Sequence, residues 1–162
     1  MNQKILMAQL FRFTGKAKLM IKLLKKHYPE YLMEAAGLGI FMISAGLFTV
    51  LFEYPNSVLH QLFPDAFVRR IFIGLAMGLT AIGIIYSPWG KQSGAHMNPA
   101  VTLTFFRLKK ISFSDTIFYI IFQTLGGTIG IYITALKYLN QLIAEKKLFL
   151  SLIHISEPTR PY

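Results

Sequence analysis

The chain has 162 residues, of which 54% are hydrophobic and only 15% are charged, and its formal net charge is +10. Its mean hydropathy of +0.48 lies well above that of an ordinary soluble domain and predicts a membrane protein. The chain has no cysteine and only four scattered histidines, which excludes disulfides and Cys-based metal sites. We therefore expect neither a metal nor a cofactor.

Residues 1–30 form a basic segment in which Lys and Arg are interspersed with large apolar residues. The basic residues are Lys4, Arg12, Lys16, Lys18, Lys22, Lys25 and Lys26. This mixture predicts an amphipathic helix on the membrane surface, with a disordered basic tail as the alternative. Basic residues at the edges of apolar segments are typical of loops that face anionic lipid, so we expect membrane lipid as a partner and no nucleic acid.

Three apolar segments are each long enough to cross a bilayer, which needs about 20 residues. They cover residues 31–52, 71–89 and 115–137, and Glu34 is the one charged residue inside the first. Glycines four residues apart, which allow close helix packing, occur in the second and third segments. These glycines are Gly74, Gly78, Gly126 and Gly130.

The distribution of Lys and Arg predicts the orientation of these segments. Residues 53–68, between the first two spans, contain no Lys or Arg, whereas residues 90–114 contain Lys91, Arg107, Lys109 and Lys110. By the positive-inside rule, the N-terminus and the second loop lie in the cytoplasm. We expect a multi-pass protein of the plasma membrane.

The second loop and the helix after it, residues 90–107, carry the most informative motif. Asn98 is a good N-cap and Pro99 a good first helical residue, where the missing N–H costs nothing. The nine residues from Pro99 to Arg107 would form about 13 Å of helix, close to half of a roughly 30 Å hydrocarbon core. Such a half-helix is tolerated inside a membrane only where it lines a cavity or is surrounded by protein, so the motif predicts a re-entrant pore loop.

The electrostatics of this half-helix suit a pore for neutral solutes. Its N-terminus carries about half a positive charge, which opposes cations and protons. The side-chain NH2 of Asn98 is free to donate to a passing oxygen atom. The sequence shows no nucleophile–base pair or metal cluster near the loop, so we expect a channel and not an enzyme.

The string Ser93-Gly94-Ala95-His96-Met97-Asn98-Pro99-Ala100-Val101-Thr102 resembles the first pore loop of the aquaporin and glycerol-facilitator (major intrinsic protein) family. Glu34-Ala35-Ala36-Gly37 is similar to the acidic start of that family's first helix, although Leu38 stands where Thr is usual. Residues 122–127 resemble its third helix. The resemblance covers residues 31–140.

The resemblance implies an all-α fold in which three transmembrane helices and one re-entrant half-helix form the first of two inverted repeats, with four subunits in the full-length assembly. It implies that Asn98, Pro99 and Ala100 form a pore motif. It further implies that Gly94, Ala95 and His96 supply pore-facing carbonyl groups, that Glu34 is a buried acceptor supporting the loop, and that Ile73 or Met77 occupies a filter position. The simpler alternatives are that His96 satisfies only a local hydrogen bond and that Glu34 lies in water near Tyr31.

The chain departs from the family pattern in two ways. It contains no second Asn-Pro-Ala motif, so we expect a truncated half-pore for water or small neutral solutes such as glycerol. Residues 148–162 resemble translated vector sequence, and we expect them to be a non-native tail. The alternatives are a half-length subunit that needs a second copy to form a pore, and a membrane-anchored interaction protein whose basic N-terminal segment binds anionic lipid or nucleic acid.

Overall fold

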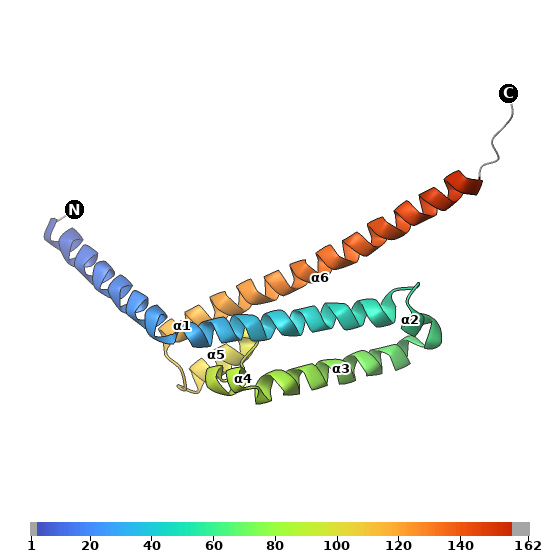
Figure 1. Ribbon diagram of the computed structural model, residues 1–162. Coiled ribbons are helices and arrows are strands. Elements are labelled where there is room, and N and C mark those ends of the chain that lie inside the picture. The colour runs from blue at the N-terminus through green and yellow to red at the C-terminus, as the bar shows by residue number, and fades with distance from the viewer. Residues whose placement is uncertain (1–2, 157–162) are drawn as a thin grey trace, which may run out of the picture.

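The computed structural model describes the backbone of residues 3–156, and their side chains except at 3–13, 16–17, 141–142 and 144–156. Every regular element in this part of the chain is a helix (Figure 1). The helices are α1 (Gln3–Glu53), α2 (Val58–Leu62), α3 (Ala66–Tyr86), α4 (Pro88–Ser93), α5 (Pro99–Arg107) and α6 (Phe113–Ser156). The predicted all-α class is confirmed. Of the expected non-native tail at 148–162, only the helical backbone as far as Ser156 is described.

Three of these helices are long and apolar enough to cross a membrane. The candidate spans are Lys18–Glu53 in α1, Ala66–Tyr86 in α3 and Phe113–Asn140 in α6. Together with the nine-residue α5, they match the predicted three spanning helices and one half-helix. Large apolar side chains remain exposed along α3, as expected for a surface that faces lipid or another part of a membrane protein. The chain is a membrane protein.

The first helix bends near its middle. His27 has non-helical dihedral angles, and Pro29 lies inside the helix two residues later. Proline lacks the N–H that would continue the helical hydrogen bonding, and its ring displaces the preceding turn. These two effects explain why the helix bends at this point. Figure 1 shows the N-terminal part of α1 leaving the bundle at this point.

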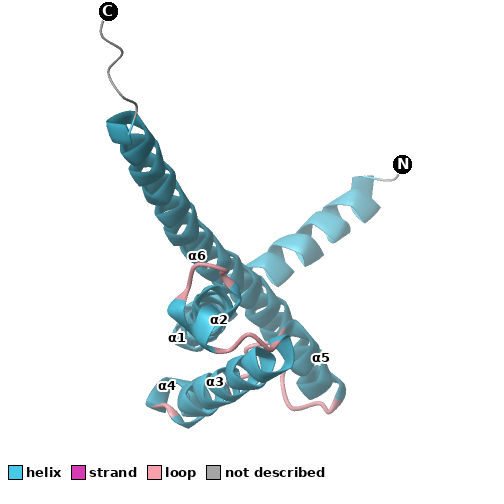
Figure 2. Cartoon of the chain, turned by 90° about the vertical axis from the view of Figure 1, so that its right-hand side faces the viewer, coloured by secondary structure: helices cyan, strands magenta, loops and turns pink. Residues whose placement is uncertain are grey.

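The bundle is organised around the second half of α1. Figure 2 shows α1 lying between α6 and α3, and α1 contacts both of them. A polar bridge of 2.8 Å between Ser44 Oγ on α1 and Thr80 Oγ1 on α3 joins the first two spans. Short helix α4 packs against α1 and α3, and α5 packs against α6.

Glycines make the contact between α1 and α6 close. A methyl group on Gly126 would overlap the Ala35 carbonyl oxygen, and one on Gly130 would overlap the Gly39 carbonyl oxygen. The prediction that glycines four residues apart allow close helix packing is therefore confirmed for Gly126 and Gly130. It is wrong for Gly74 and Gly78, since a Cβ at either position would meet no described atom within 4 Å. Small residues permit close approach, but α3 turns a different face toward α1.

Candidate pore-loop site

The half-helix α5 begins with the predicted cap. Asn98 is extended, and its Oδ1 accepts a 2.8 Å hydrogen bond from the backbone N–H of Ala100. Pro99 occupies the first turn, and the helix ends at Arg107. Asn98 is exposed, and its side-chain nitrogen makes no hydrogen bond within the described part of the chain. One end of this amide therefore orients the helix while the other faces outward.

The loop before α5 has an unfavourable backbone conformation. Gly94, Ala95 and Met97 all have positive φ angles, of 92°, 47° and 46°. Glycine adopts this left-handed region freely, but a residue with a Cβ is strained there by about 1–2 kcal/mol. Two strained residues persist only where surrounding contacts define the conformation.

Glu34 provides those contacts. Its side chain is fully buried, and its Oε1 accepts hydrogen bonds from Ser93 Oγ at 2.8 Å and from the backbone N–H of His96 at 2.9 Å. Its Oε2 accepts from the backbone N–H of Met97 and from Gln123 Nε2, both at 2.8 Å. Glu34 has no ion-pair partner among the described residues. Neutral dipoles from the loop and α6 thus replace the water that a carboxylate normally needs.

His96 is buried and packs among aromatic rings. Its ring stacks on Phe105 with centroids 4.4 Å apart and lies 5.1 Å from the ring of Tyr119. Its Nδ1 lies 3.1 Å from Thr102 Oγ1. His96 is outside the three spanning helices, and burial lowers the pKa of its imidazole, while the charge of Glu34 partly opposes that shift. The neutral ring is therefore favoured. Its contact with Glu34 is made by the backbone N–H and not by the imidazole.

Comparison with known proteins identifies the family of this chain. Residues 22–155 match the family model described as Major intrinsic protein. The chain belongs to the major intrinsic protein family. The resemblance seen in the pore-loop sequence is thereby confirmed.

Several curated aquaporins are similar to this member of the family. It is 43% identical to aquaporin-4 of Mus musculus over 63 residues, which are 39% of this chain and 19% of that protein. It is 34% identical to aquaporin-5 of Sus scrofa over 84 residues, or 52% and 31%. It is 37% identical to aquaporin-2 of Orycteropus afer over 89 residues, or 55% and 81%. The chain thus spans about a fifth of the length of its aquaporin-4 relatives. No solved structure matches it.

Two residues of α6 in this family member support the site, although neither was identified as a site residue from the sequence. Gln123 is fully buried and donates to both Glu34 and Thr102, at 2.8 and 3.0 Å. Tyr119 donates a 2.8 Å hydrogen bond to the carbonyl oxygen of Ser93. The available signal was their four-residue spacing, which places two polar side chains on one face of an otherwise apolar span.

A cavity of about 320 Å³ lies beside the loop, between α1, α3 and α4. Residues that line it include Met33, Glu34, Ile40, Thr80, Ile84, Trp89, Ala95 and Met97. Gly37 lies on its wall, where the Met97 side chain occupies the space that a Cβ would need. Neither of the two expected filter residues, Ile73 and Met77, lines this cavity. Both lie on α3, half-buried.

Proposed function

We propose that this chain is the first repeat of a channel that passes water or small neutral solutes, such as glycerol, across the plasma membrane. The proposal depends chiefly on the strained loop 94–97, which a single buried carboxylate holds at the start of a capped half-helix. A protein that needed only a connection between two spanning helices would have no use for such a loop. The loop fits a site in which backbone N–H and C=O groups must point in fixed directions.

In the proposed pore, the loop and α5 supply complementary groups. The N-terminus of α5 carries a partial positive charge, which orients the oxygen of a solute toward it and opposes cations. The free amide nitrogen of Asn98 donates to that oxygen. The carbonyl groups of Gly94, Ala95 and His96 accept hydrogen bonds from the solute on its way to the midplane. We assign no catalytic step to any residue.

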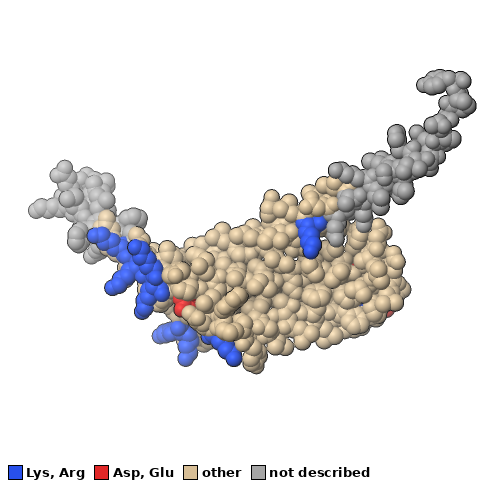
Figure 3. All heavy atoms as spheres, in the orientation of Figure 1, with Lys and Arg blue, Asp and Glu red and all other residues tan. Residues whose placement is uncertain are grey.

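We propose that the N-terminus and the pore loop face the cytoplasm. Lys and Arg gather at the end of the bundle where α1 bends and α5 ends (Figure 3). At the opposite end, buried Arg69 pairs with Glu53 at 3.0 Å, which neutralises one of the two arginines there. The concentration of Lys and Arg at one end of the bundle is the asymmetry that the positive-inside rule uses. The same asymmetry argues against a pore made from two copies in opposite orientations.

A complete pore would need a second half-helix facing α5. We therefore propose that a second repeat covers the exposed side chains of α5 and α3, and that the full-length protein forms a homotetramer. Val101, Leu103 and Phe105 on α5 remain exposed and offer an apolar surface for that repeat.

Osmotic shrinkage of proteoliposomes tests this function. We expect vesicles containing the product of the gene's full reading frame to shrink faster than empty vesicles, and vesicles containing this chain alone to match empty ones. Glycerol and water gradients applied separately would define the solute. Shrinkage of the full-frame vesicles at the empty-vesicle rate in both gradients would overturn the proposal.

A further inference from the structure

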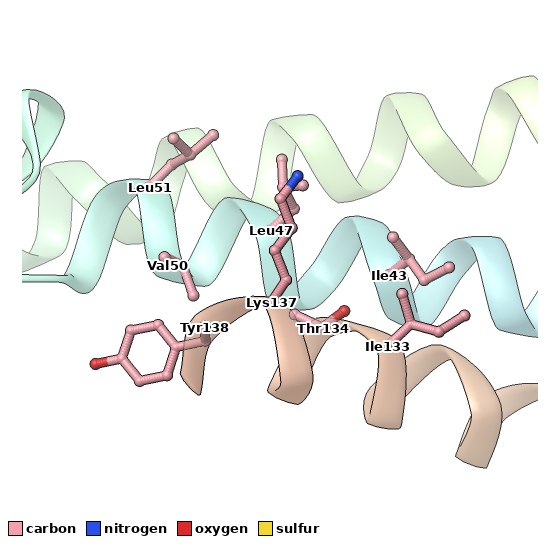
Figure 4. Close-up of a pocket in the computed structure, with 8 residues that line it drawn as sticks. All are labelled: Ile43, Leu47, Val50, Leu51, Ile133, Thr134, Lys137 and Tyr138. Carbon is pink, nitrogen blue, oxygen red and sulfur yellow. The ribbon is translucent and has the colours of Figure 1, made fainter. Parts of the chain in front are cut away.

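A second cavity lies far from the pore loop, between the C-terminal part of α1 and α6, and its volume is about 290 Å³. Its lining residues are Ile43, Leu47, Val50, Leu51, Ile133, Thr134, Lys137 and Tyr138 (Figure 4). The close approach of Gly46 to Thr134 lies within its length, because Ile43 and Ile133 line the groove before that contact. Beyond that contact α1 carries larger side chains, and Figure 1 shows α6 diverging from it. The result is a groove with a largely apolar lining.

One cation lines this groove. Lys137 is the only Lys or Arg among the α6 residues whose side chains are described, and it has no ion-pair partner within the described residues. Figure 4 shows its side chain reaching from α6 toward α1, with the nitrogen near Leu47. Lysine in this setting keeps its stem on apolar surface and its ammonium at the polar boundary.

A tyrosine pair marks the same level of the molecule. The rings of Tyr138 on α6 and Tyr54 at the end of α1 meet edge to face, with centroids 5.6 Å apart. Tyrosine concentrates where the hydrocarbon core meets the headgroups of the bilayer. Tyr138 itself lines the groove, so the groove extends from the hydrocarbon region to headgroup depth, and Lys137 is the residue next to Tyr138.

We propose that this groove binds one acyl chain of a phospholipid whose anionic headgroup rests on Lys137. The apolar lining suits the acyl chain, and the one cation of the lining, Lys137, suits the anionic headgroup. A second copy of this chain fits less well, because a two-fold contact through the groove would bring two Lys137 side chains together. The site is separate from the cavity beside the loop 94–97, because the two share no lining residue.

The charge of Lys137 makes the proposal specific for the headgroup. A basic side chain near an anionic lipid surface contributes about 1 kcal/mol, which corresponds to about fivefold in affinity. Phosphatidylglycerol should therefore be retained about fivefold better than phosphatidylcholine of the same acyl composition. Both lipids should still compete for the apolar part of the groove.

Photo-crosslinking of the full 162-residue chain tests this site. The probes are phosphatidylglycerol and phosphatidylcholine with a diazirine in one acyl chain, and labelled peptides are mapped by mass spectrometry. We expect labelling to concentrate in residues 43–51 and 133–138. Lys137→Gln should lower phosphatidylglycerol labelling about fivefold and leave phosphatidylcholine labelling unchanged. Lys110→Gln, which removes a cation at the other end of the bundle, should change neither.

A second set of variants fills the groove with a larger side chain and is tested by the same labelling experiment. Leu47→Trp should reduce labelling by both lipids, and Val50→Phe serves the same purpose if that variant fails to fold. Leu125→Trp, at an exposed position of α6 outside the groove, is the matched control for bulk. Labelling spread evenly over the exposed face of α3, equal labelling of Lys137→Gln and wild type by phosphatidylglycerol, or cross-links from the groove to a second copy would each overturn the proposal.

Discussion

Gln123 donates a 2.8 Å hydrogen bond to Glu34, and this bond joins the first and third spanning helices behind the pore loop. Glu34 uses its remaining acceptor sites on Ser93 and on the backbone N–H groups of His96 and Met97. The loop is thus held by side chains of α1 and α6. Its conformation depends on the meeting of α1 and α6 and not on the loop sequence alone.

Replacing Glu34 should destabilise the fold strongly. In Glu34→Gln the new NH2 group cannot accept, so a buried loop N–H loses its partner. We expect the free energy of unfolding to fall by about 3 kcal/mol, because unsatisfied buried groups carry that cost. The measurement is unfolding in SDS, followed by fluorescence of Trp89, the only tryptophan.

Glu30→Gln is the matched control for that experiment. Glu30 precedes Glu34 by one turn, and its Oε2 is buried without a hydrogen-bond partner among the described atoms. We expect no loss of stability from Glu30→Gln, because this side chain holds no backbone N–H of the loop and its amide oxygen can still accept the exposed 3.3 Å hydrogen bond from Gln92 Nε2. Equal losses in the two variants would contradict the anchoring role of Glu34.

The bond between Glu34 and Gln123 should appear as an energetic coupling. Gln123→Leu removes the donor from both Glu34 and Thr102, and the double variant with Glu34→Gln completes a mutant cycle. We expect a coupling energy of about 1–2 kcal/mol between the two positions, because they share one buried network. Additive effects in the same SDS assay would show that the two residues act separately.

The glycines of α6 should not tolerate a methyl group. Gly126→Ala and Gly130→Ala place a Cβ against the backbone of α1, and we expect each to cost about 1–3 kcal/mol through overpacking. Gly74→Ala and Gly78→Ala meet open space and should be neutral or stabilise α3 by up to about 1 kcal/mol through helix propensity. Thermal unfolding in detergent separates the two pairs, and losses of similar size in all four would argue against this packing.

Relieving the strain in the loop should stabilise the chain. Ala95 has a φ of 47°, so Ala95→Gly removes a cost of about 1–2 kcal/mol, part of which the greater freedom of the unfolded chain takes back. The same change inside α3, Ala76→Gly, should destabilise by about 1 kcal/mol. Stabilisation by Ala95→Gly together with destabilisation by Ala76→Gly would support strain in the loop. Destabilisation by both substitutions would contradict it.

Acid should weaken the site through His96. Burial lowers the pKa of His96 in the folded state, so its contribution to stability is complete above the unfolded pKa of about 6.5 and is lost as the pH falls below it. His96→Gln should lack this component while retaining the other histidines. The measurement is the unfolding free energy of wild type and of His96→Gln, each at pH 7.5 and at pH 5. Equal losses in the two proteins between these pH values would contradict the role of His96.

The local features of the site could be predicted from sequence because they depend on neighbouring residues. Asn98 and Pro99 start α5 wherever the helix lies, and the apolar segments identify three spans by length alone. The bend at His27 is different. Pro29 was visible in the sequence, but the helical continuation on both sides of it was not. At the bend, His27 Nδ1 lies 3.1 Å from Asp115 Oδ1 at the start of α6, a contact that sequence spacing does not reveal.

The partners of Glu34 could not be predicted, because they arise from tertiary contacts. An acidic residue inside an apolar span indicates a buried network but not its members. Gln123 lies 89 positions away in the chain. The bond to the backbone of His96, in place of its ring, depends on the positive φ angles of the loop. Positive φ angles at residues other than glycine, such as Ala95 and Met97, cannot be predicted from sequence spacing.

The most direct test of the account is the role of Asn98 in water permeation. Asn98→Asp keeps an oxygen for capping but removes the NH2 donor and adds a negative charge at the start of α5. In proteoliposomes containing the product of the full reading frame, we expect osmotic water flux to fall toward the rate of empty vesicles. The same substitution at Asn56, an exposed residue outside the loop, should leave the flux unchanged. Equal flux in wild type and Asn98→Asp would contradict the proposal that this half-helix lines a pore.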